Sequence, residues 1–519
     1  MRHEQSRATR NHLGNPRSAG IQFSARVRHR AGTSRTARRA TVLVAASALL
    51  AVAVPAANAS GAARASGAAD EARAAQRTTA AHRATDAPNG CDAARTALGR
   101  SLDTLVTRHV IPGVAAEVIG RDCGRWTAER GVADLHTGRP MRAADRLRIG
   151  SVTKTFTATV VVQLADEGRI GLDDPVERYL PGLIRGNGHD GRTITVRQLL
   201  QHTSGLPDYT EAIVERPVDE WRFRHFEPRE LVATALAMPR PATEWHYSTT
   251  NSVIAGMIVE KVTGHGVEAE VRRRIIEPLG LRDTYWPGDR TRIRGPHSRS
   301  YFPAAGSADA ARPDTTSSSD GAPLSDGTSL SDGTEWNMTF GGAGGALVST
   351  PGDVNRFFRG LFGGRLVSAH GLAEMKRTVP ADPERLWPGA RYGLGLIASP
   401  LTCGGMWWGH GGTVPGGHRA LGAIGPDGRG IALALNKVPD SQEAEADFLA
   451  AVDVGLCPAD RAPHASSTDS TTGTDSTTGT DSTTGTDSTT GTENTTGTEN
   501  TTGTENTTGN STDQLRETE

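Results

Sequence analysis

Apolar residues recur at helical or strand spacing through the central part of the chain, residues 91–457. Residues 92–110 carry apolar side chains at helical intervals, which predicts a helix. Residues 113–135 predict two strands joined by a turn. Residues 151–168 predict a helix, and because apolar residues occupy most of its faces, we expect this helix to be buried inside the protein.

The middle of the chain favours helices and the last third favours strands. Helices are predicted over 195–202, 228–239, 250–280 and 350–362, and strands over 405–413, 418–424 and 430–438. Residues 303–334 are rich in Ser, Asp and Gly and predict a flexible insertion. Strands at both ends with helices between them predict an α/β fold. Its antiparallel sheet combines N- and C-terminal strands flanked by helices, and a mostly helical subdomain completes it.

Both ends of the chain fall outside this pattern. Residues 41–54 form an apolar run too short to span a bilayer, and a small-x-small triplet follows at 57–59. We therefore predict a signal peptide over 1–59, a linker over 60–90 and a secreted protein, by an export route left open; an uncleaved N-terminal anchor is the alternative. Residues 458–519 contain Thr-Gly-Asp repeats without apolar residues able to build a core, which predicts a disordered tail.

Composition narrows the classes of partner. The formal net charge is -1, from 57 basic and 58 acidic residues, which gives no basic surface for nucleic acid. Neither Cys-x-x-Cys nor His-x-x-x-His spacing occurs, so we predict no metal and no cofactor. Four cysteines in a secreted chain predict disulfides, with three possible pairings. We expect a monomer that acts on a small molecule and has no membrane span in its mature form.

The stretch RIGSVTKTF, residues 148–156, places a serine and a lysine three positions apart at a predicted helix start. A serine hydroxyl is a weak nucleophile until a base takes its proton. Lys154 lies one turn after Ser151 on the same helix face, and an apolar helix disfavours the charged form of a lysine. Taken alone, such a pair is more often a helix-capping serine and a surface lysine.

Three later segments of the sequence favour a catalytic role for Ser151 and Lys154. Tyr247 precedes a predicted apolar helix, His410 lies on a predicted strand in WGHGGT, and LLQHTSGLPDY covers residues 199–209. Singly, Tyr247 is more often a core tyrosine and His410 a turn residue. Together and in this order, the segments resemble the serine penicillin-recognising family, which includes D-alanyl-D-alanine carboxypeptidases, class C β-lactamases and related esterases. The resemblance is greatest for the secreted Streptomyces-type carboxypeptidases and is carried by SVTKTFTATVVVQLADEG, ITVRQLLQHTSGLPDYT, NSVIAGMIVEKVTGH, AGGALVSTPGDV and YGLGL.

The resemblance implies an acyl-enzyme mechanism. Ser151 would attack the substrate, while Lys154 and Tyr247 would move protons, with nearby cations making Tyr247 easier to ionise. His410 would orient the tyrosine or the substrate. The N–H groups of Ser151 and Thr413 would form the oxyanion hole, and the neighbouring Gly412 would let the substrate lie close to the strand.

Two positions depart from the motifs of this family. Thr249 stands where the family usually has asparagine, and Gly411 where it has threonine. Both changes weaken recognition of an amide or carboxylate more than they weaken acylation. Arg391 and Arg419 are the candidates to hold a substrate carboxylate, although each is more often a solvated residue, and Trp336 is expected to line the substrate pocket.

The resemblance also bears on the cysteines and on function. It supports the pair Cys403–Cys457, which leaves Cys91–Cys123 as the other disulfide. It implies a D-alanyl-D-alanine carboxypeptidase-like hydrolase of cell-wall peptides. A broad esterase or β-lactamase of the same family is one alternative, and a catalytically silent member that binds cell-wall peptide or a partner is another. The implied partners are a peptide, ester or β-lactam substrate and peptidoglycan.

Overall fold

The computed structural model describes residues 90–303, 322–323 and 329–457. The predicted signal peptide over 1–59, the linker over 60–90 apart from Gly90, and the tail over 458–519 lie outside the described residues. Within the described part of the chain, no helix is both long enough and apolar enough to cross a membrane.

A nine-stranded antiparallel sheet forms the centre of the domain, in the order β11-β12-β13-β14-β15-β16-β1-β2-β3. Within this sheet the first strand of the domain pairs with the last, with Val114 opposite Leu435. This pairing confirms the predicted sheet of N- and C-terminal strands. The strands are β1 (Gly113–Gly120), β2 (Gly124–Asp134), β3 (Arg139–Pro140), β11 (Val379–Pro380), β12 (Arg391–Tyr392), β13 (Ile397–Pro400), β14 (Met406–Thr413), β15 (Arg419–Ile424) and β16 (Gly430–Leu435).

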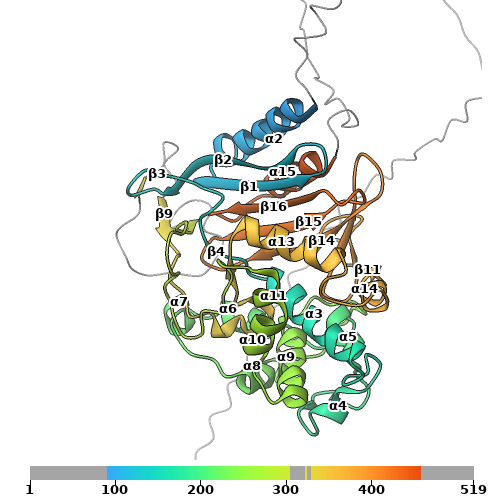
Figure 1. The fold of residues 1–519 in the computed structure, drawn as a ribbon. Coiled ribbons are helices and arrows are strands. Elements are labelled where there is room, and N and C mark those ends of the chain that lie inside the picture. Colours follow the sequence, from blue (N-terminus) through green and yellow to red (C-terminus); the bar gives the residue numbers. More distant parts are fainter. Residues whose placement is uncertain (1–89, 304–321, 324–328, 458–519) are drawn as a thin grey trace, which may run out of the picture. The chain divides into compact units, whose positions relative to one another are not determined.

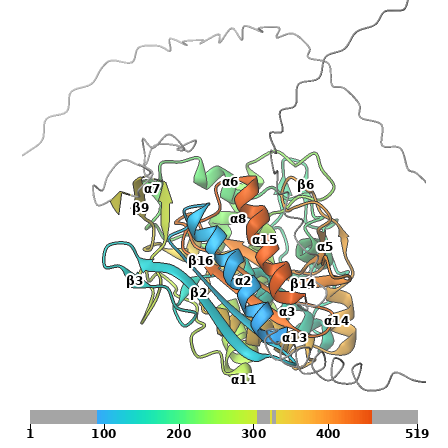
Figure 2. The same cartoon turned by 90° about the horizontal axis from the view of Figure 1, so that it is seen from above.

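Helices from the two ends of the domain lie side by side over one face of this sheet (Figures 1 and 2). They bury apolar side chains such as Leu102 and Phe448 against the strands, and a third helix packs on the opposite face through Phe358. The last helix was not predicted, although Ser441 caps its first turn. These helices are α2 (Gly90–Thr107), α15 (Gln442–Leu456) and, on the opposite face, α13 (Pro351–Phe362).

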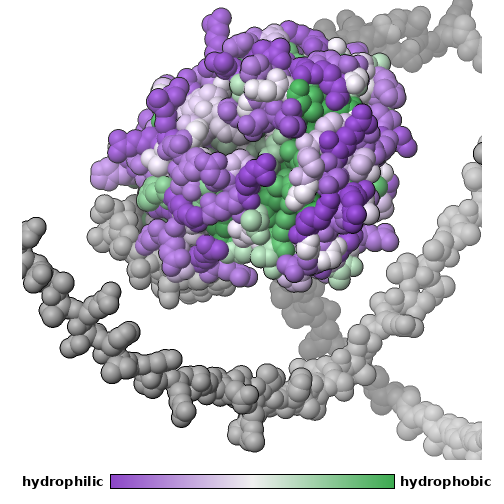
Figure 3. Space-filling model, turned by 90° about the horizontal axis from the view of Figure 1, so that it is seen from below, coloured by the Kyte–Doolittle hydropathy of each residue, from purple (hydrophilic) through white to green (hydrophobic). Residues whose placement is uncertain are grey.

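A mostly helical subdomain adjoins that opposite face (Figure 1). Its central helix α3 is buried along almost its whole length and packs against α9 and α12, as its apolar composition predicts. The helix predicted over 250–280 is interrupted, because Gly264 takes a left-handed conformation, φ 77°, and ends α9. Seen from the side of this subdomain, the described surface is mainly hydrophilic and a narrow hydrophobic band crosses it (Figure 3). The helices are α3 (Val152–Asp166), α4 (Val176–Tyr179), α5 (Val196–Gln201), α6 (Tyr209–Val214), α7 (Val218–Trp221), α8 (Pro228–Leu236), α9 (Thr249–Thr263), α10 (Val267–Val271), α11 (Glu277–Leu279), α12 (Gly342–Gly345) and α14 (Ala369–Met375), with a π-helical turn at Arg272–Ile276 and a 3-10 turn at Met338–Phe340.

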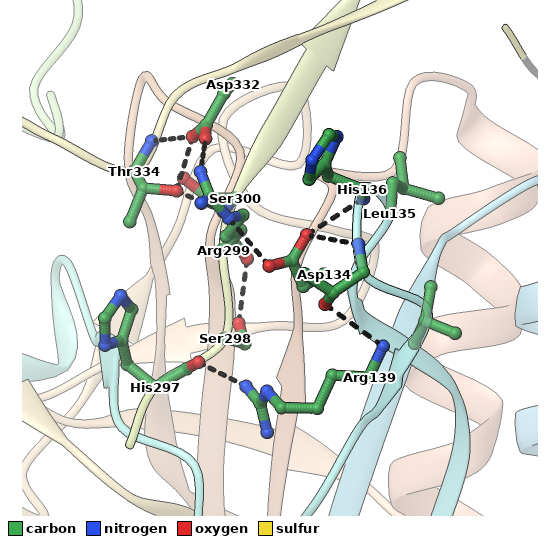
Figure 4. A network of polar contacts seen from close by, with 12 residues as sticks. Asp134, Leu135, His136, Arg139, His297, Ser298, Arg299, Ser300, Asp332 and Thr334 are labelled. Atoms are coloured by element: carbon green, nitrogen blue, oxygen red, sulfur yellow. Dashed lines mark hydrogen bonds and ion pairs between the residues drawn. The ribbon is translucent and has the colours of Figure 1, made fainter. Parts of the chain in front are cut away.

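The insertion predicted over 303–334 is ordered at its C-terminal end. Strand β9 pairs there with β7, and Arg299 contacts both Asp134 on β2 and Asp332 on β9 (Figure 4). Thr334 is buried and donates to Asp332 at 2.5 Å. These contacts show that residues 329–334 are ordered, whereas residues 304–321 and 324–328 of the predicted insertion lie outside the described residues. The smaller strand groups are β4 (Leu147–Arg148) with β10 (Val348–Ser349), β5 (Arg185–Gly186) with β6 (His189–Asp190), and β7 (Tyr301–Pro303) with β9 (Ser329–Asp332) and β8 (Ala322–Pro323).

Both predicted disulfides are present. Cys91 near the start of α2 bonds to Cys123 in the turn between β1 and β2, and Cys403 before β14 bonds to Cys457 at the end of α15. Each bridge therefore ties an outer helix to a turn of the sheet. Loops of 32 and 54 residues are closed in this way, and the loss of chain entropy in the unfolded state makes each bridge worth about 3 to 4 kcal/mol.

Candidate active site

Ser151 lies at the entrance of α3, on a backbone turn that only glycine suits. Gly150 has φ +50°, and a Cβ there would lie 2.6 Å from the carbonyl oxygen of Thr413 on β14. The Ser151 side chain makes no capping hydrogen bond to the helix that it precedes. Its hydroxyl instead faces Lys154, so the interpretation of Ser151 as a plain capping residue is wrong.

Lys154 is buried one turn into α3, with 2% of its surface exposed. Its Nζ donates to Ser151 Oγ at 3.1 Å, to Gly344 O at 3.1 Å and to Thr249 Oγ1 at 3.3 Å. A Cβ at position 344 would lie 3.2 Å from Nζ, so the glycine leaves the room that the lysine occupies. Burial lowers the pKa of Lys154 to about 8, while the negative charge of Asp208 opposes that shift. A surface lysine is therefore excluded.

Tyr247 covers the lysine from the segment before α9. Lys154 Nζ lies 4.8 Å from the centre of the Tyr247 ring, and the imidazole of His202 packs on the same ring at 4.4 Å. The phenol is desolvated among these groups, which raises the pKa of Tyr247 well above 10; a hydrogen bond with Ser151 partly offsets this rise. The expectation that nearby cations make Tyr247 easier to ionise is therefore wrong, because desolvation outweighs their effect.

The end of β14 approaches the backbone of the serine. A Cβ at Gly412 would lie 2.7 Å from the backbone nitrogen of Ser151, and a Cβ at Gly150 would lie 2.9 Å from that of Thr413. The two backbone N–H groups are thus close together. Ser151 is half-buried and Thr413 is exposed, so this corner of the site is open to solvent.

Ser151 and the buried Lys154 contact each other beside an antiparallel sheet. The domain that contains them also matches a known protein family along most of its length. The family described as Beta-lactamase matches residues 98–456. The chain belongs to the Beta-lactamase family. This membership and the fold confirm the resemblance to the serine penicillin-recognising enzymes.

Relatives within the Beta-lactamase family have several activities. The chain is 40% identical to a D-stereospecific amidohydrolase from Streptomyces sp., with a TM-score of 0.58, covering 69% of this chain and 99% of that one. It is 35% identical over 205 residues to esterase EstB of Burkholderia gladioli, which is 37% of this chain and 52% of EstB. It is also 35% identical over 185 residues to penicillin-binding protein 4 of Amycolatopsis lactamdurans, which is 35% of this chain and 46% of that protein. The matches thus span only about half of the length of these two curated relatives.

His410 of this Beta-lactamase family member is held in a buried chain of hydrogen bonds. Its Nε2 lies 2.8 Å from the hydroxyl of Tyr392, which lies 3.2 Å from Nε2 of His202. The backbone N–H of Ser248 donates to Nδ1 of His202, so the proton of neutral His202 is on Nε2. Nε2 of His202 then donates to Tyr392, and the Tyr392 hydroxyl donates to His410.

His410 therefore carries its own proton on Nδ1, which lies 2.5 Å from the carbonyl oxygen of Gly411. Burial lowers the pKa of His410 to about 3 and keeps the imidazole neutral. Because both ring nitrogens are engaged in this way, His410 does not hold Tyr247 by a hydrogen bond, and the expected role of orienting the tyrosine or the substrate stays a prediction. Its ring centre lies 6.4 Å from that of Tyr247, so it contributes packing next to the phenol.

The two departures from the family motifs have local consequences. Thr249 places a hydroxyl beside Lys154, whereas Asn251 turns toward Ser204 at 2.7 Å and does not replace the missing amide. At the other departure, a Cβ at Gly411 would lie 2.7 Å from the guanidinium of Arg419. The glycine therefore makes room for a cation behind the strand.

The two candidate arginines differ in exposure. Arg419 is 6% exposed and forms an ion pair with Glu445 at 2.5 Å, so the expectation of a solvated side chain is wrong for this residue. Arg391 is exposed and donates to Thr378, as expected for a solvated arginine. Trp336 is 2% exposed, its indole donates to Gly333 O at 2.6 Å, and it packs in the core. This burial removes Trp336 from the expected lining of a substrate pocket.

Several residues of the site were missed by sequence reasoning. Gly344 and Asp208 surround Lys154 together with Thr249, and His202 and Tyr392 connect Tyr247 with His410. His202 and Asp208 lie within the motif LLQHTSGLPDY, whose presence was noted without assigning a role to either side chain. The density of polar residues in an otherwise apolar region was the available signal.

Proposed function

We propose that this chain is a serine hydrolase that forms an acyl-enzyme on Ser151. The observation that carries the proposal is the 3.1 Å contact between Ser151 Oγ and the buried Lys154 Nζ, whose pKa lies near 8. A lysine with this pKa is neutral in a useful fraction of molecules near neutral pH. It can then take the serine proton, as a general base must.

In the proposed reaction, each step moves one proton between two named groups. Lys154 removes the proton of Ser151 as Oγ attacks the substrate carbonyl, and the backbone N–H groups of Ser151 and Thr413 stabilise the resulting oxyanion. Tyr247, held neutral by desolvation, donates its proton to the leaving group, and protonated Lys154 restores the phenol. Water then attacks the acyl-enzyme with the same groups in reverse. His410 keeps the phenol in place by packing.

The proposed substrates are amides or esters of D-amino acids that have a neutral leaving group. The 40% identity to a D-stereospecific amidohydrolase, over 99% of that chain, supports the D configuration and the amide bond. The ion pair between Arg419 and Glu445 supports a neutral leaving group, because a substrate carboxylate would have to compete with Glu445 for this guanidinium. A D-alanyl-D-alanine carboxypeptidase is the second candidate, supported by the similarity to penicillin-binding protein 4.

We further propose that the mature enzyme is secreted as a monomer. Its two disulfides support this location, because such bonds persist in oxidising compartments. Peptidoglycan fragments that carry D-amino acids are then within its reach.

The experiment that tests the proposal compares D- and L-amino acid amides, D-alanyl-D-alanine peptides and an activated nitrophenyl ester, with mass analysis of the protein. We expect turnover of the D-amide and the ester, a slower release of D-alanine, and an acyl adduct on Ser151. Ser151→Ala should abolish all turnover. The matched control is Ser368→Ala, since Ser368 does cap a helix: it should cost about 1 kcal/mol of stability and no activity. If the wild type neither forms an adduct nor hydrolyses the ester, the chain is a binding protein and the proposal is wrong.

A further inference from the structure

Lys154 Nζ has three polar neighbours, and they differ in what they can donate. Gly344 contributes a carbonyl oxygen, which only accepts, while Ser151 and Thr249 contribute hydroxyls, which can donate or accept. A neutral amine has two N–H groups and one lone pair. The lysine works as a base only if that lone pair, rather than an N–H group, faces Ser151.

Thr249 alone would leave this arrangement undecided. Its hydroxyl could donate to the lone pair of Lys154, which would turn an N–H group toward Ser151 and block proton transfer. The hydroxyl has another neighbour, however: Asp208 Oδ2 lies 3.2 Å from Thr249 Oγ1. The Thr249 hydroxyl donates to this carboxylate oxygen, so the Thr249 proton points to Asp208.

The carboxylate is itself well placed to do this. Asp208 is 6% exposed, and its other oxygen accepts from the backbone N–H of Thr210 at 3.0 Å. Asp208 is the residue that precedes α6, whereas Thr249 begins α9, so the contact joins two helices beside the lysine. Among the described residues, no arginine or lysine forms an ion pair with Asp208; its side chain accepts from Thr249, and its charge raises the pKa of Lys154.

We propose that Asp208 is a positioning residue that fixes the Thr249 hydroxyl as an acceptor toward Lys154, so that the lone pair of neutral Lys154 faces Ser151. The two N–H groups of the amine are then taken by Gly344 O and Thr249 Oγ1. The serine proton passes to the lone pair as Oγ bonds to the substrate carbonyl. Protonation adds the third N–H in place and requires no rotation of the amine.

This inference rests on the proposed function and explains how the chain works without the asparagine amide usual in the family. An amide oxygen only accepts, so an asparagine presents its oxygen to the lysine without help. A threonine hydroxyl needs a second group to fix its direction. Thr249 and Asp208 together therefore do the work of one amide oxygen.

The charged and titratable groups around Lys154 define the pH response. Burial keeps His202 and His410 neutral by lowering their pKa values, and desolvation keeps Tyr247 neutral. Arg419 is paired with Glu445. The negative charge of Asp208 raises the pKa of Lys154. Removing that charge should lower this pKa.

The test follows the acylation of Ser151 by an activated nitrophenyl ester as a function of pH, for the wild type and for Asp208→Asn, Thr249→Val and Thr249→Ser. We expect Asp208→Asn to lower the plateau rate roughly tenfold and to move the acid limb to lower pH. Thr249→Val should lower the plateau similarly, and Thr249→Ser should retain most of it. The double variant Asp208→Asn/Thr249→Val should be little worse than Thr249→Val, because Asp208 acts through that hydroxyl.

The matched control is Asp353→Asn. Asp353 is also a buried carboxylate that accepts from a threonine hydroxyl, Thr284 at 3.0 Å, but it belongs to α13 and should leave the acid limb unchanged. An Asp208→Asn enzyme with an unchanged acid limb and plateau overturns the inference, and so do effects of Asp208→Asn and Thr249→Val that multiply. If Asp208→Asn does not fold, a Thr249→Ser enzyme as slow as Thr249→Val is the contradicting result. A wild type that never acylates Ser151 overturns the proposed function and this inference with it.

Discussion

Two buried cations stand three residues before and three residues after Ser151, and their surroundings differ. Arg148 is 0% exposed and Lys154 is 2% exposed. The Arg148 guanidinium donates to the backbone carbonyls of Thr334 and Thr291. Lys154 instead contacts two hydroxyls and one carbonyl next to an open corner of the sheet.

Burial lowers the pKa of both cations, but their charge states near neutral pH differ. It lowers the pKa of Arg148 to about 10, which leaves a permanent charge at neutral pH. It lowers the pKa of Lys154 to about 8, which brings the neutral amine within reach. Similar burial thus leaves the arginine charged at neutral pH and brings the lysine near its neutral form, because their ordinary pKa values differ; this difference supports the proposed roles of Arg148 as a structural clamp and Lys154 as a base.

The largest expected effect comes from exchanging one cation for the other. Lys154→Arg should lower the acylation rate about 10³-fold, because a guanidinium does not release its proton. Stopped-flow measurement with an activated ester gives the rate, and near-ultraviolet circular dichroism checks the fold. A Lys154→Arg enzyme within tenfold of the wild type would show that the lysine is not the base.

A second effect concerns the phenol above the lysine. Tyr247→Phe should slow turnover of a D-amino acid amide about 100-fold, since the leaving amine then lacks its proton donor. An activated ester, whose leaving group needs no proton, should lose much less. Equal losses for both substrates would assign Tyr247 a role in packing alone. In the double variant Lys154→Met/Tyr247→Phe, the loss of rate should fall well short of the product of the two single losses.

The structural cation should behave in the opposite way. Arg148→Met should lower the free energy of unfolding by about 3 kcal/mol, because two buried carbonyls lose their donors. The rate per folded molecule should stay within about twofold of the wild type. Urea denaturation and active-site titration measure the two quantities. If Arg148→Met lowers the rate greatly even when all molecules are folded, Arg148 takes part in the reaction.

The smallest expected effect is a gain in stability. Lys154→Met should raise the free energy of unfolding by about 1 kcal/mol at pH 7, because it removes a buried charge. The sign follows from the lowered pKa of Lys154: below about pH 8 the folded state carries the charge at full cost, and this cost falls to zero as pH rises past the ordinary value of 10.5. The gain should therefore shrink across that interval. Urea denaturation at several pH values tests this, and a gain that grows with pH would contradict it.

The sequence predicts the fold and the site to different extents. Strands β14 to β16 and helix α3 were predictable, because their apolar patterns are long and their turns contain glycine. The short strands β11 to β13 were not, because each has too few residues to show a period.

Within the site, motif residues were predictable but their states were not. The sequence places Ser151 and Lys154 one turn apart, which fixes their contact once α3 forms. It does not show that Tyr392 occupies Nε2 of His410, since these residues meet only when β12 and β14 join the same sheet. The partnership of Asp208 and Thr249 likewise requires two helices to meet. Burial and long-range contacts, which set the pKa values, are properties of the packed chain.

The most direct test of the account is the pH dependence of acylation at Ser151. Wild-type enzyme is mixed with an activated nitrophenyl ester from about pH 6 to about pH 10, and the acyl adduct is located by mass spectrometry of peptides. We expect an adduct on Ser151 whose rate of formation rises with pH through a midpoint near 8 and then levels, as Lys154 loses its proton. A rate that is flat across this range, or an adduct on another residue, would contradict it.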